Sequence, residues 1–438
     1  MFRYYIWLAL RSLRRNPMLT ALMVAAIGLG IGASMTTLSL FRAMSGDPIP
    51  QKSAQLFTPL IDNWGPDQRE KNGEPGQDML TYTDAVALMN LHAARRQAAM
   101  YATGFAVMPT DPTQNPFQAD ARATGADFFA MFDVPFKYGT PWSAADDEAR
   151  ADVVVLGRKL NDKLFGGANS VGKTVNLDNH DYRVVGVLDD WSPQPRMYDV
   201  MDQTFGEVEA LFLPFNTAIG RQMDIWGNNN CAGPTVVDPG FEGHMRSECT
   251  WVQFWAELNT AEQVQHYRTL LDGYAAEQQH NGRFHWAPLT RLYDVRKWFD
   301  VQHVVPDESR VMVVVSFGFL FVCLVNAVGL MLAKFMTRAS EIGVRRAIGA
   351  NRRAVFTQCL VETGVIGLAG GLVGLALTAV GLAGMRALLS KDMADLTHLD
   401  LIDVLVTVAL AVLAAMLAGL YPTWRATQVQ PAWQLKAN

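Results

Sequence analysis

Residues 17–41 read PMLTALMVAAIGLGIGASMTTLSLF, a run of 25 residues without a charged side chain. An α-helix rises about 1.5 Å per residue, so about 20 residues are enough to cross a hydrocarbon layer about 30 Å thick. Three further uncharged runs follow at residues 311–333, 363–385 and 404–424. The sequence therefore predicts an α-helical membrane protein with four transmembrane helices and a long polar segment between the first and the second.

The distribution of lysine and arginine predicts how the chain is threaded. Residues 1–16 and 334–362 carry four and six basic residues, whereas residues 44–310 hold 22 basic and 36 acidic ones. Basic segments close to a span are retained in the cytoplasm. We therefore expect both termini and the 334–362 loop to be cytoplasmic, and residues 44–310 to lie outside.

These observations give the following expected order of parts. A cytoplasmic amphipathic helix spans 1–16, transmembrane helices span 17–43, 311–333, 363–385 and 404–424, the outer domain spans 44–310, the cytoplasmic loop spans 334–362, a short outer loop spans 386–403, and a cytoplasmic tail spans 425–438.

The first sixteen residues admit two interpretations. A cleaved signal peptide has an apolar core of about 7–15 residues, shorter than the run at 17–41, so we interpret that run as a retained span. Ahead of it, one helical face is apolar, which is typical of a helix lying among lipid headgroups; it consists of Phe2, Tyr5, Ile6, Leu10 and Leu13. Arginines that only fix the topology would explain the same segment.

The pattern of the outer segment predicts a mixed α/β domain, which we expect to be divided into two lobes. Helical periodicity covers 82–97 and 261–279, strands are expected at 153–156, 252–258 and 283–286, and alternating residues predict a hairpin over 174–187. Helical periodicity then resumes from Arg291 towards the second span. We interpret the many acidic side chains of this segment as a solvated surface.

Two of the four cysteines are candidates for a disulfide. Cys231 and Cys249 lie in the outer segment, within a stretch rich in glycine, asparagine and proline, whereas Cys323 and Cys359 lie in or beside predicted spans. In an oxidising compartment, closing a loop of this size stabilises a fold by about 3 kcal/mol. The alternative is a pair of free thiols.

One string imitates a nucleotide-binding loop. Residues 167–174 read GANSVGKT and satisfy the P-loop pattern through Gly167, Gly172, Lys173 and Thr174. A true P-loop follows a strand and opens a helix, so that backbone amides converge on the phosphates. Here the string leads into the alternating residues 175–187. We therefore expect a turn before a hairpin and no cofactor site.

The sequence offers no catalytic or metal-binding constellation. Its eight histidines are scattered, with no HExxH or CxxC spacing. Basic clusters are short and lie beside the spans, so nothing indicates nucleic-acid binding. We expect a non-catalytic chain without a metal or cofactor of its own.

The most specific string is SEIGVRRAIGANRR at residues 340–353. It predicts a short helix that ends at Gly349, with charged side chains available to a soluble partner. The candidate partner contacts are Glu341, Gly343, Arg345, Arg346 and Gly349. Alternatively, the arginines only hold the topology and the glycines only turn the chain.

This string resembles the cytoplasmic signature of MacB-type, or FtsX-like, permeases of ABC transporters. LALRSLRRNP at 8–17, LFGG at 164–167, GKT at 172–174 and Tyr421-Pro422 agree with the same family. The resemblance implies a bacterial inner-membrane permease that docks a cytoplasmic ABC ATPase, which binds ATP and magnesium. Because some relatives carry that ATPase on the same chain and this sequence starts at the membrane-entry helix, we expect a separate ATPase subunit.

The resemblance also implies a dimer, since four spans are few for a transporter; the second protomer is either a copy of this chain or a related one. Small residues at four-residue spacing allow close helix packing in membranes. Such residues occur in the first and third spans, at Gly28, Gly32, Gly367, Gly370, Gly371 and Gly374. Lipid-facing glycine is the alternative. Asn326, polar and mid-span, could bond another helix or its own backbone.

For function, the resemblance favours a subunit that relays ATPase-driven motion to its periplasmic domain and exports a drug, peptide or other amphiphile. A periplasmic adaptor and an outer-membrane channel belong to that assembly. Two alternatives share the architecture: a lipoprotein-release permease, and an FtsX-like signalling subunit that activates a cell-wall hydrolase. The residues do not identify the substrate.

Overall fold

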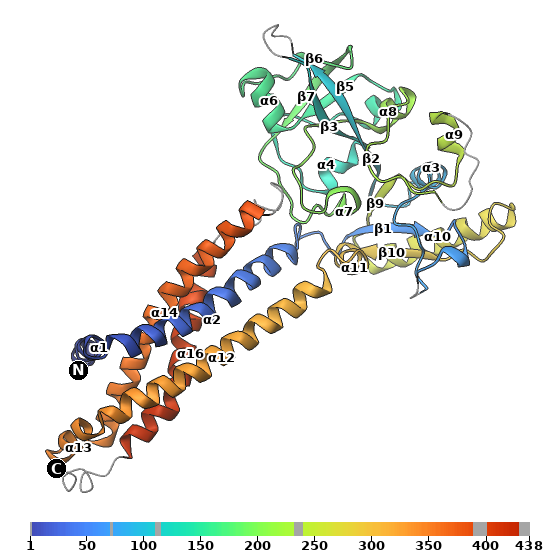
Figure 1. The fold of residues 1–438 in the computed structure, drawn as a ribbon. Helices are drawn as coiled ribbons and strands as arrows, with labels where there is room; N and C mark the ends of the chain where they lie inside the picture. The colour runs from blue at the N-terminus through green and yellow to red at the C-terminus, as the bar shows by residue number, and fades with distance from the viewer. Residues whose placement is uncertain (1, 71–72, 110–114, 232–239, 389–400, 429–438) are drawn as a thin grey trace. The chain divides into compact units, whose positions relative to one another are not determined.

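Figure 1 shows the computed structural model, which describes residues 2–70, 73–109, 115–231, 240–388 and 401–428. The chain divides into two compact units, Met1–Ser45 with Val305–Asn438, and Gly46–Val304. The first unit is helical and the second is the polar insertion. Most of the expected outer loop at 386–403 and the end of the tail lie outside the described residues.

Within the described residues, the helical unit contains four helices that are long and apolar enough to cross a membrane. Its described elements are α1 (Phe2–Arg15), α2 (Pro17–Met44), α12 (Asp307–Thr337), α13 (Ala339–Ala347), α14 (Arg352–Leu388) and α16 (Leu401–Thr427). Proline suits the first helical position, where no amide donor is needed, and Pro17 begins α2 in this way.

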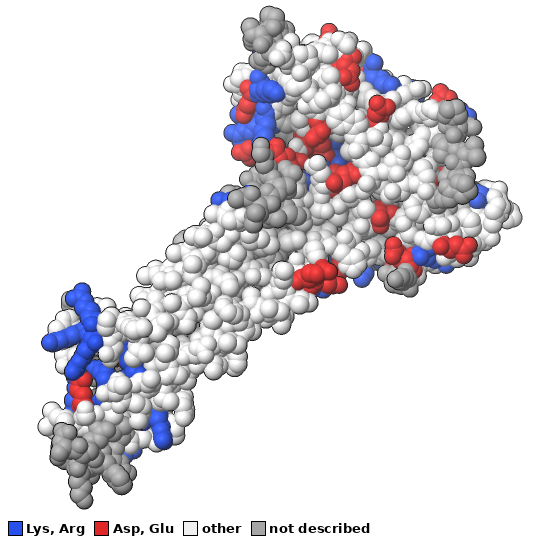
Figure 2. Space-filling view, in the orientation of Figure 1, with Lys and Arg blue, Asp and Glu red and all other residues white. Residues whose placement is uncertain are grey.

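Charged residues extend these helices beyond the uncharged runs. α12 begins at Asp307 and continues through Lys334, and α14 begins at Arg352, ahead of the apolar run at 363–385. Figure 2 shows that most of the helix surface carries no charge, while lysine and arginine gather at the end of the bundle where α1 and α13 lie. The apolar length defines the membrane-facing part, and the helices themselves are longer.

The spaced glycines lie where helices cross. A Cβ atom on Gly28 of α2 would come within 2.7 Å of a Val373 side-chain atom on α14, and one on Gly370 would come within 2.7 Å of Ile27. Contacts of this kind leave no space for a side chain. The same holds for Gly32 and Gly374 at the α2–α14 crossing and for Gly367 and Gly371 at the α14–α16 crossing.

The outer unit is built on one ten-stranded sheet, so the two expected lobes share a sheet. The strands are β1 (Leu56–Ile61), β2 (Arg96–Met108), β3 (Phe117–Thr124), β4 (Phe136–Gly139), β5 (Val153–Leu156), β6 (Thr174–Leu177), β7 (His180–Leu188), β8 (Leu211–Pro214), β9 (Gln253–Glu257) and β10 (Thr290–Asp294). Their order is β10-β1-β9-β2-β3-β8-β5-β7-β4, and β6 pairs with β2 and β7.

Helices of 3 to 20 residues cover this sheet. They are η1 (Pro66–Gln68), α3 (Tyr82–Leu91), α4 (Asp127–Met131), α5 (Ala144–Glu148), α6 (Arg158–Phe165), α7 (Val200–Gln203), α8 (Phe215–Gly220), α9 (Phe241–Arg246), α10 (Ala261–His280) and α11 (Val295–Val301). Both faces of the sheet are buried. One core contains Tyr101 and Trp251, and the other contains Phe128, Phe212 and Trp255.

Three expectations for the outer segment are wrong. The helix at 82–97 ends at Leu91, because His92 adopts a left-handed conformation with φ of 46°, and β2 starts at Arg96. Residues 283–286 form no strand; Arg283 instead pairs with Asp84 at 2.6 Å and Glu248 at 2.7 Å. The helical pattern from Arg291 begins inside β10, which pairs with β1.

The acidic residues are also not all on a solvated surface. Arg122 of β3 is completely buried and pairs with Glu209 at 2.6 Å and with Asp199, which in turn pairs with Arg196 at 2.8 Å. Cys231 and Cys249 form a disulfide. Charge pairing and a covalent bond thus fix segments that carry little periodic pattern.

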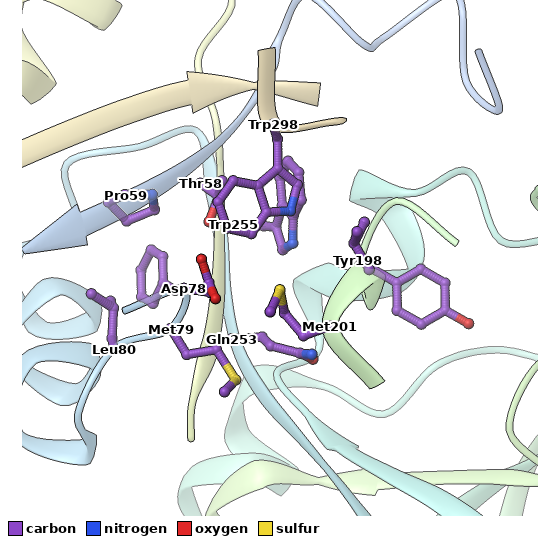
Figure 3. Close-up of a pocket in the computed structure, with 12 residues that line it drawn as sticks. Thr58, Pro59, Asp78, Met79, Leu80, Tyr198, Met201, Gln253, Trp255 and Trp298 are labelled. Carbon is purple, nitrogen blue, oxygen red and sulfur yellow. The ribbon is translucent and has the colours of Figure 1, made fainter. Parts of the chain in front are cut away.

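A small cavity in the outer unit is lined by a half-buried carboxyl group, that of Asp78. Figure 3 shows Asp78 among Met79, Trp255 and Trp298, which line this cavity. The Gln302 amide donates a hydrogen bond of 2.7 Å to Asp78 Oδ1. Burial raises the pKa of Asp78 above its ordinary value, although the Gln302 hydrogen bond opposes this rise.

We expect Gly370→Leu to destabilise the bundle by about 1–3 kcal/mol, because the added side chain overpacks the α2–α14 crossing. The measurement is the thermal unfolding midpoint of the detergent-solubilised chain. Gly384→Leu on the same helix is the matched control, since a Cβ there meets nothing within 4 Å. Equal midpoints for the two variants would contradict the packing role.

The Asp78 carboxyl group should make stability depend on pH. An unfolded aspartate has a pKa of about 3.9. Because the folded pKa is higher, the protonated carboxyl contributes stability that is present below pH 4 and lost as the pH rises through the folded pKa. Asp78→Asn keeps the Gln302 acceptor and should remove this dependence.

The measurement is the free energy of urea unfolding of the full chain between pH 4 and 7, followed by tryptophan fluorescence. Asp78→Asn should have a higher free energy of unfolding than the native chain, and this difference should increase with pH. A constant difference across this range would show that Asp78 does not titrate there.

Candidate functional site

The short helix α13 connects the end of α12 to the start of α14. Gly349 ends this segment with φ of +106°, a conformation that side chains disfavour, and its amide donates to the Arg346 carbonyl at 3.2 Å. A Cβ on Gly349 would meet no atom within 4 Å, so backbone conformation rather than space requires glycine. Gly343 is buried in the middle of α13.

The charged residues of α13 are bonded to the bundle. Arg345 pairs with Glu341 at 2.7 Å and donates to Gln358 of α14 at 3.1 Å. Glu341 also pairs with Arg15 of α1 at 3.1 Å. Arg346 donates to the Thr427 carbonyl of α16 at 3.1 Å. These side chains hold α13 in position against three other helices.

The surface that α13 exposes is mainly apolar. Val344 and Ile348, four residues apart, are 53% and 82% exposed, and Ala347 beside them is also exposed. Arg352 and Arg353 follow at the exposed start of α14. We call these five residues the α13 surface. Val344 and Ile348 were not among the predicted contacts, although apolar residues at i and i+4 in a charged helix are a signal for an exposed apolar surface.

Two buried charges were also missed. Lys334 of α12 and Glu362 of α14 are each 1% exposed and pair at 2.8 Å. Each borders an uncharged run, so the sequence marked them only as ends of spans. An ionisable residue within a spanning helix is a functional candidate in its own right.

The other predicted residues lie elsewhere. Asn326 is on the exposed surface of α12, and its side chain makes no hydrogen bond within the part of the chain that the structure describes. Within the described part of one protomer, Asn326 therefore bonds neither another helix nor its own backbone. The GANSVGKT string forms the turn after α6: Gly167 and Gly172 have positive φ, and Lys173 and Thr174 lead into β6. No helix follows it, and Lys173 Nζ lies 5.1 Å from the centre of the Phe165 ring.

Among the described residues, no group of three or more histidine, cysteine, aspartate or glutamate side chains could hold a metal ion. The notable feature of this end of the bundle is α13, a short helix fixed between two spans, with Val344 and Ile348 exposed on its outer side.

Two protein-family models match the chain. The MacB-like periplasmic core domain matches residues 20–265, and the FtsX-like permease C-terminal domain matches residues 313–431. The chain belongs to the MacB-like, FtsX-type permease family. It is thus a multi-pass inner-membrane permease of the ABC transporter class, with a periplasmic α/β domain between the first and the second of its apolar helices.

Individual relatives are distant. The chain is 23% identical to the macrolide export ATP-binding/permease protein MacB of Marinobacter nauticus, over 98% of this chain and 60% of that protein. It is 25% identical to the pyoverdine export ATP-binding/permease protein PvdT of Pseudomonas syringae pv. tomato, over 71% of this chain and 41% of that protein. The chain therefore spans less than two thirds of the length of either relative.

Among solved structures, the periplasmic region of MacB from Actinobacillus actinomycetemcomitans aligns with 58% of this chain and 94% of its own, at 14% identity and a TM-score of 0.37. The α13 surface and the Lys334–Glu362 pair both fall in the segment that matches the FtsX-like permease domain.

Proposed function

We propose that this chain is the membrane-spanning part of an ATP-driven MacB-like efflux transporter, and that a nucleotide-binding subunit docks on the α13 surface. The observation that supports this most directly is the outward-facing Val344 and Ile348 on a helix whose charged side chains bind the bundle. Burying exposed apolar side chains drives most protein association. ATP and magnesium belong to the docked subunit, a separate polypeptide, and this chain itself is non-catalytic.

The proposed mechanism is transmission of movement rather than conduction. The uncharged spans offer almost no charged lining for an aqueous path. α2 ends at Met44 and α12 begins at Asp307, so the chain passes between each of these helices and the periplasmic domain within a few residues. Movement of α13 on ATP binding would travel along α12, and the periplasmic domain would expel a drug, peptide or other amphiphile towards a periplasmic adaptor and outer-membrane channel.

A second copy of the permease completes the proposed transporter. The exposed surface of α12 presents Asn326 together with Val322, Val325 and Gly329, on which a Cβ would meet nothing within 4 Å. An amide that faces hydrocarbon without a hydrogen bond is costly, and small residues allow a second helix to approach closely. We propose that the same face of a second protomer covers Asn326.

The docking proposal predicts that Val344→Glu with Ile348→Glu weakens binding of the nucleotide-binding subunit at least tenfold, because two charges replace the apolar contact. The measurement is the amount of ATP-hydrolysing protein that co-purifies with the tagged chain from native membranes. Arg11→Glu with Arg14→Glu on α1 adds the same two carboxylates elsewhere and should retain binding.

Two results would contradict the proposal. If the native chain retained no ATP-hydrolysing protein, the transporter function would be wrong. If the Val344→Glu, Ile348→Glu chain retained as much as the native chain, docking would use another surface. Correct membrane insertion of each variant is checked by protease accessibility, which also tests the proposed cytoplasmic location of both termini.

The dimer proposal predicts that Asn326→Cys forms a disulfide between two copies in oxidised membranes, in a background where Cys323 and Cys359 are replaced by serine. Leu368→Cys is the matched control, since Leu368 is an exposed residue on α14. Non-reducing gels report the dimer. Cross-linking at residue 368 and not at residue 326 would place the interface on another helix.

A further inference from the structure

A buried ionic cluster lies at the end of the bundle that carries α13. Its members are Ser12, Lys334, Arg338 and Glu362, which we call the Glu362 cluster. Glu362 Oε1 accepts from Lys334 Nζ at 2.8 Å and from the Ser12 hydroxyl at 2.5 Å, and Glu362 Oε2 accepts from Arg338 at 3.2 Å. Arg338 also donates to the Ser12 hydroxyl at 2.6 Å.

Stability alone does not account for this cluster. Lys334 and Glu362 are each 1% exposed, so both lose nearly all hydration. The cost of removing a buried ion pair from water commonly cancels its attraction, and apolar replacements of similar size are often as stable or more so. The position of the pair within the bundle is therefore the better guide to its role.

One carboxylate joins three helices and a helix junction. Glu362 belongs to α14, Ser12 to α1 and Lys334 to α12, while Arg338 is the single residue between α12 and α13. Arg338 also lies 3.5 Å from Glu341, the first acidic residue of α13. The carboxylate of Glu362 thus contacts the point about which α13 would turn.

A second series of contacts leads from Arg338 through the side chains of α13 to α14. Arg338 contacts Glu341, Glu341 pairs with Arg345, and Arg345 donates to Gln358, one turn before Glu362 on α14. Glu341 additionally pairs with Arg15 at the end of α1. A rotation of α13 therefore changes contacts with α1, α12 and α14 at once.

We propose that Glu362 is a positioning residue that couples displacement of α13 to α1 and to the membrane helices. This role rests on the proposed docking of a nucleotide-binding subunit on α13. Glu362 does not touch that subunit in this account; it acts through Arg338 and Ser12. When Glu362 carries no charge, α13 still docks the subunit and ATP is still hydrolysed. The displacement of α13 is then not transmitted to α1 or to the membrane helices.

The test variant is Lys334→Met with Glu362→Gln. It removes both buried charges together, so no unpaired ion remains in the bundle, and glutamine can still accept from Ser12. The probe is Leu10→Cys on the exposed face of α1, in a background where Cys323 and Cys359 are replaced by serine. The measurement is its rate of maleimide labelling, with and without ATP and vanadate, in liposomes containing the chain and its co-purified ATPase.

With the Glu362 cluster intact, we expect ATP and vanadate to change the labelling rate of Leu10→Cys at least fivefold. In the Lys334→Met, Glu362→Gln variant this change should fall below twofold, while ATPase retention and hydrolysis stay within twofold of the native values. A purely structural role would lower the unfolding midpoint and leave the nucleotide response intact. Asp307→Asn with Arg310→Gln, which alters charged residues at the other end of α12, is the matched control and should behave as native.

Ser12→Ala is the second variant, for the case in which the double variant does not insert. It removes only the hydroxyl that links α1 to Glu362, and should reduce the labelling change with little loss of stability. A native nucleotide response in either inserted variant would overturn the role of Glu362. Loss of ATPase retention by the native chain would instead refute the proposed function on which the role rests.

Discussion

A hydrocarbon layer offers backbone amides and charged side chains no partner, and this constraint shapes the helical unit. Each spanning segment must form its own hydrogen bonds as a helix, and helices that meet there associate through packing rather than through release of water. The α2–α14 crossing meets this demand with glycines on both helices, where a Cβ at either position would collide with the other helix. The close approach of these helices fixes the frame on which α1 and α13 are placed.

The same constraint moves charge to the ends of the helices, where it is paired. Glu362 and Lys334 are buried, but they pair with each other at the end of the bundle, and Glu362 also accepts from Arg338 and Ser12. The charged residues of α13 are similarly bonded inward. As a result, Val344 and Ile348 form the outward face at α13. The segment has a charged sequence and yet presents an apolar surface.

The periplasmic domain follows different rules because its sheet is buried on both faces. Strands such as β5, with the sequence VVVL, are continuous apolar runs and were identifiable from the sequence. β2 and β3 were not, because alanine, glycine and arginine residues interrupt their apolar pattern. Arg122 is acceptable in a buried strand only because Glu209 and Asp199, distant in sequence, neutralise it. Residues 82–97 read as a single helix because propensity does not show where His92 turns the chain.

The sequence by itself determined the four spans, the polar insertion, the α/β class of that insertion and the short helix that ends at Gly349. These properties follow from uncharged length, local periodicity and the backbone freedom of glycine, all of which are local. Only the tertiary structure decided which charges face each other and which side of α13 remains exposed. Glu341, Arg345 and Arg346 are available to a partner as far as the sequence shows, yet α1, α14 and α16 occupy them. Pairing energy depends on distances of a few ångströms between residues that lie from 13 positions apart, as Arg345 and Gln358 do, to 326 positions apart, as Arg15 and Glu341 do, and no local pattern encodes such distances.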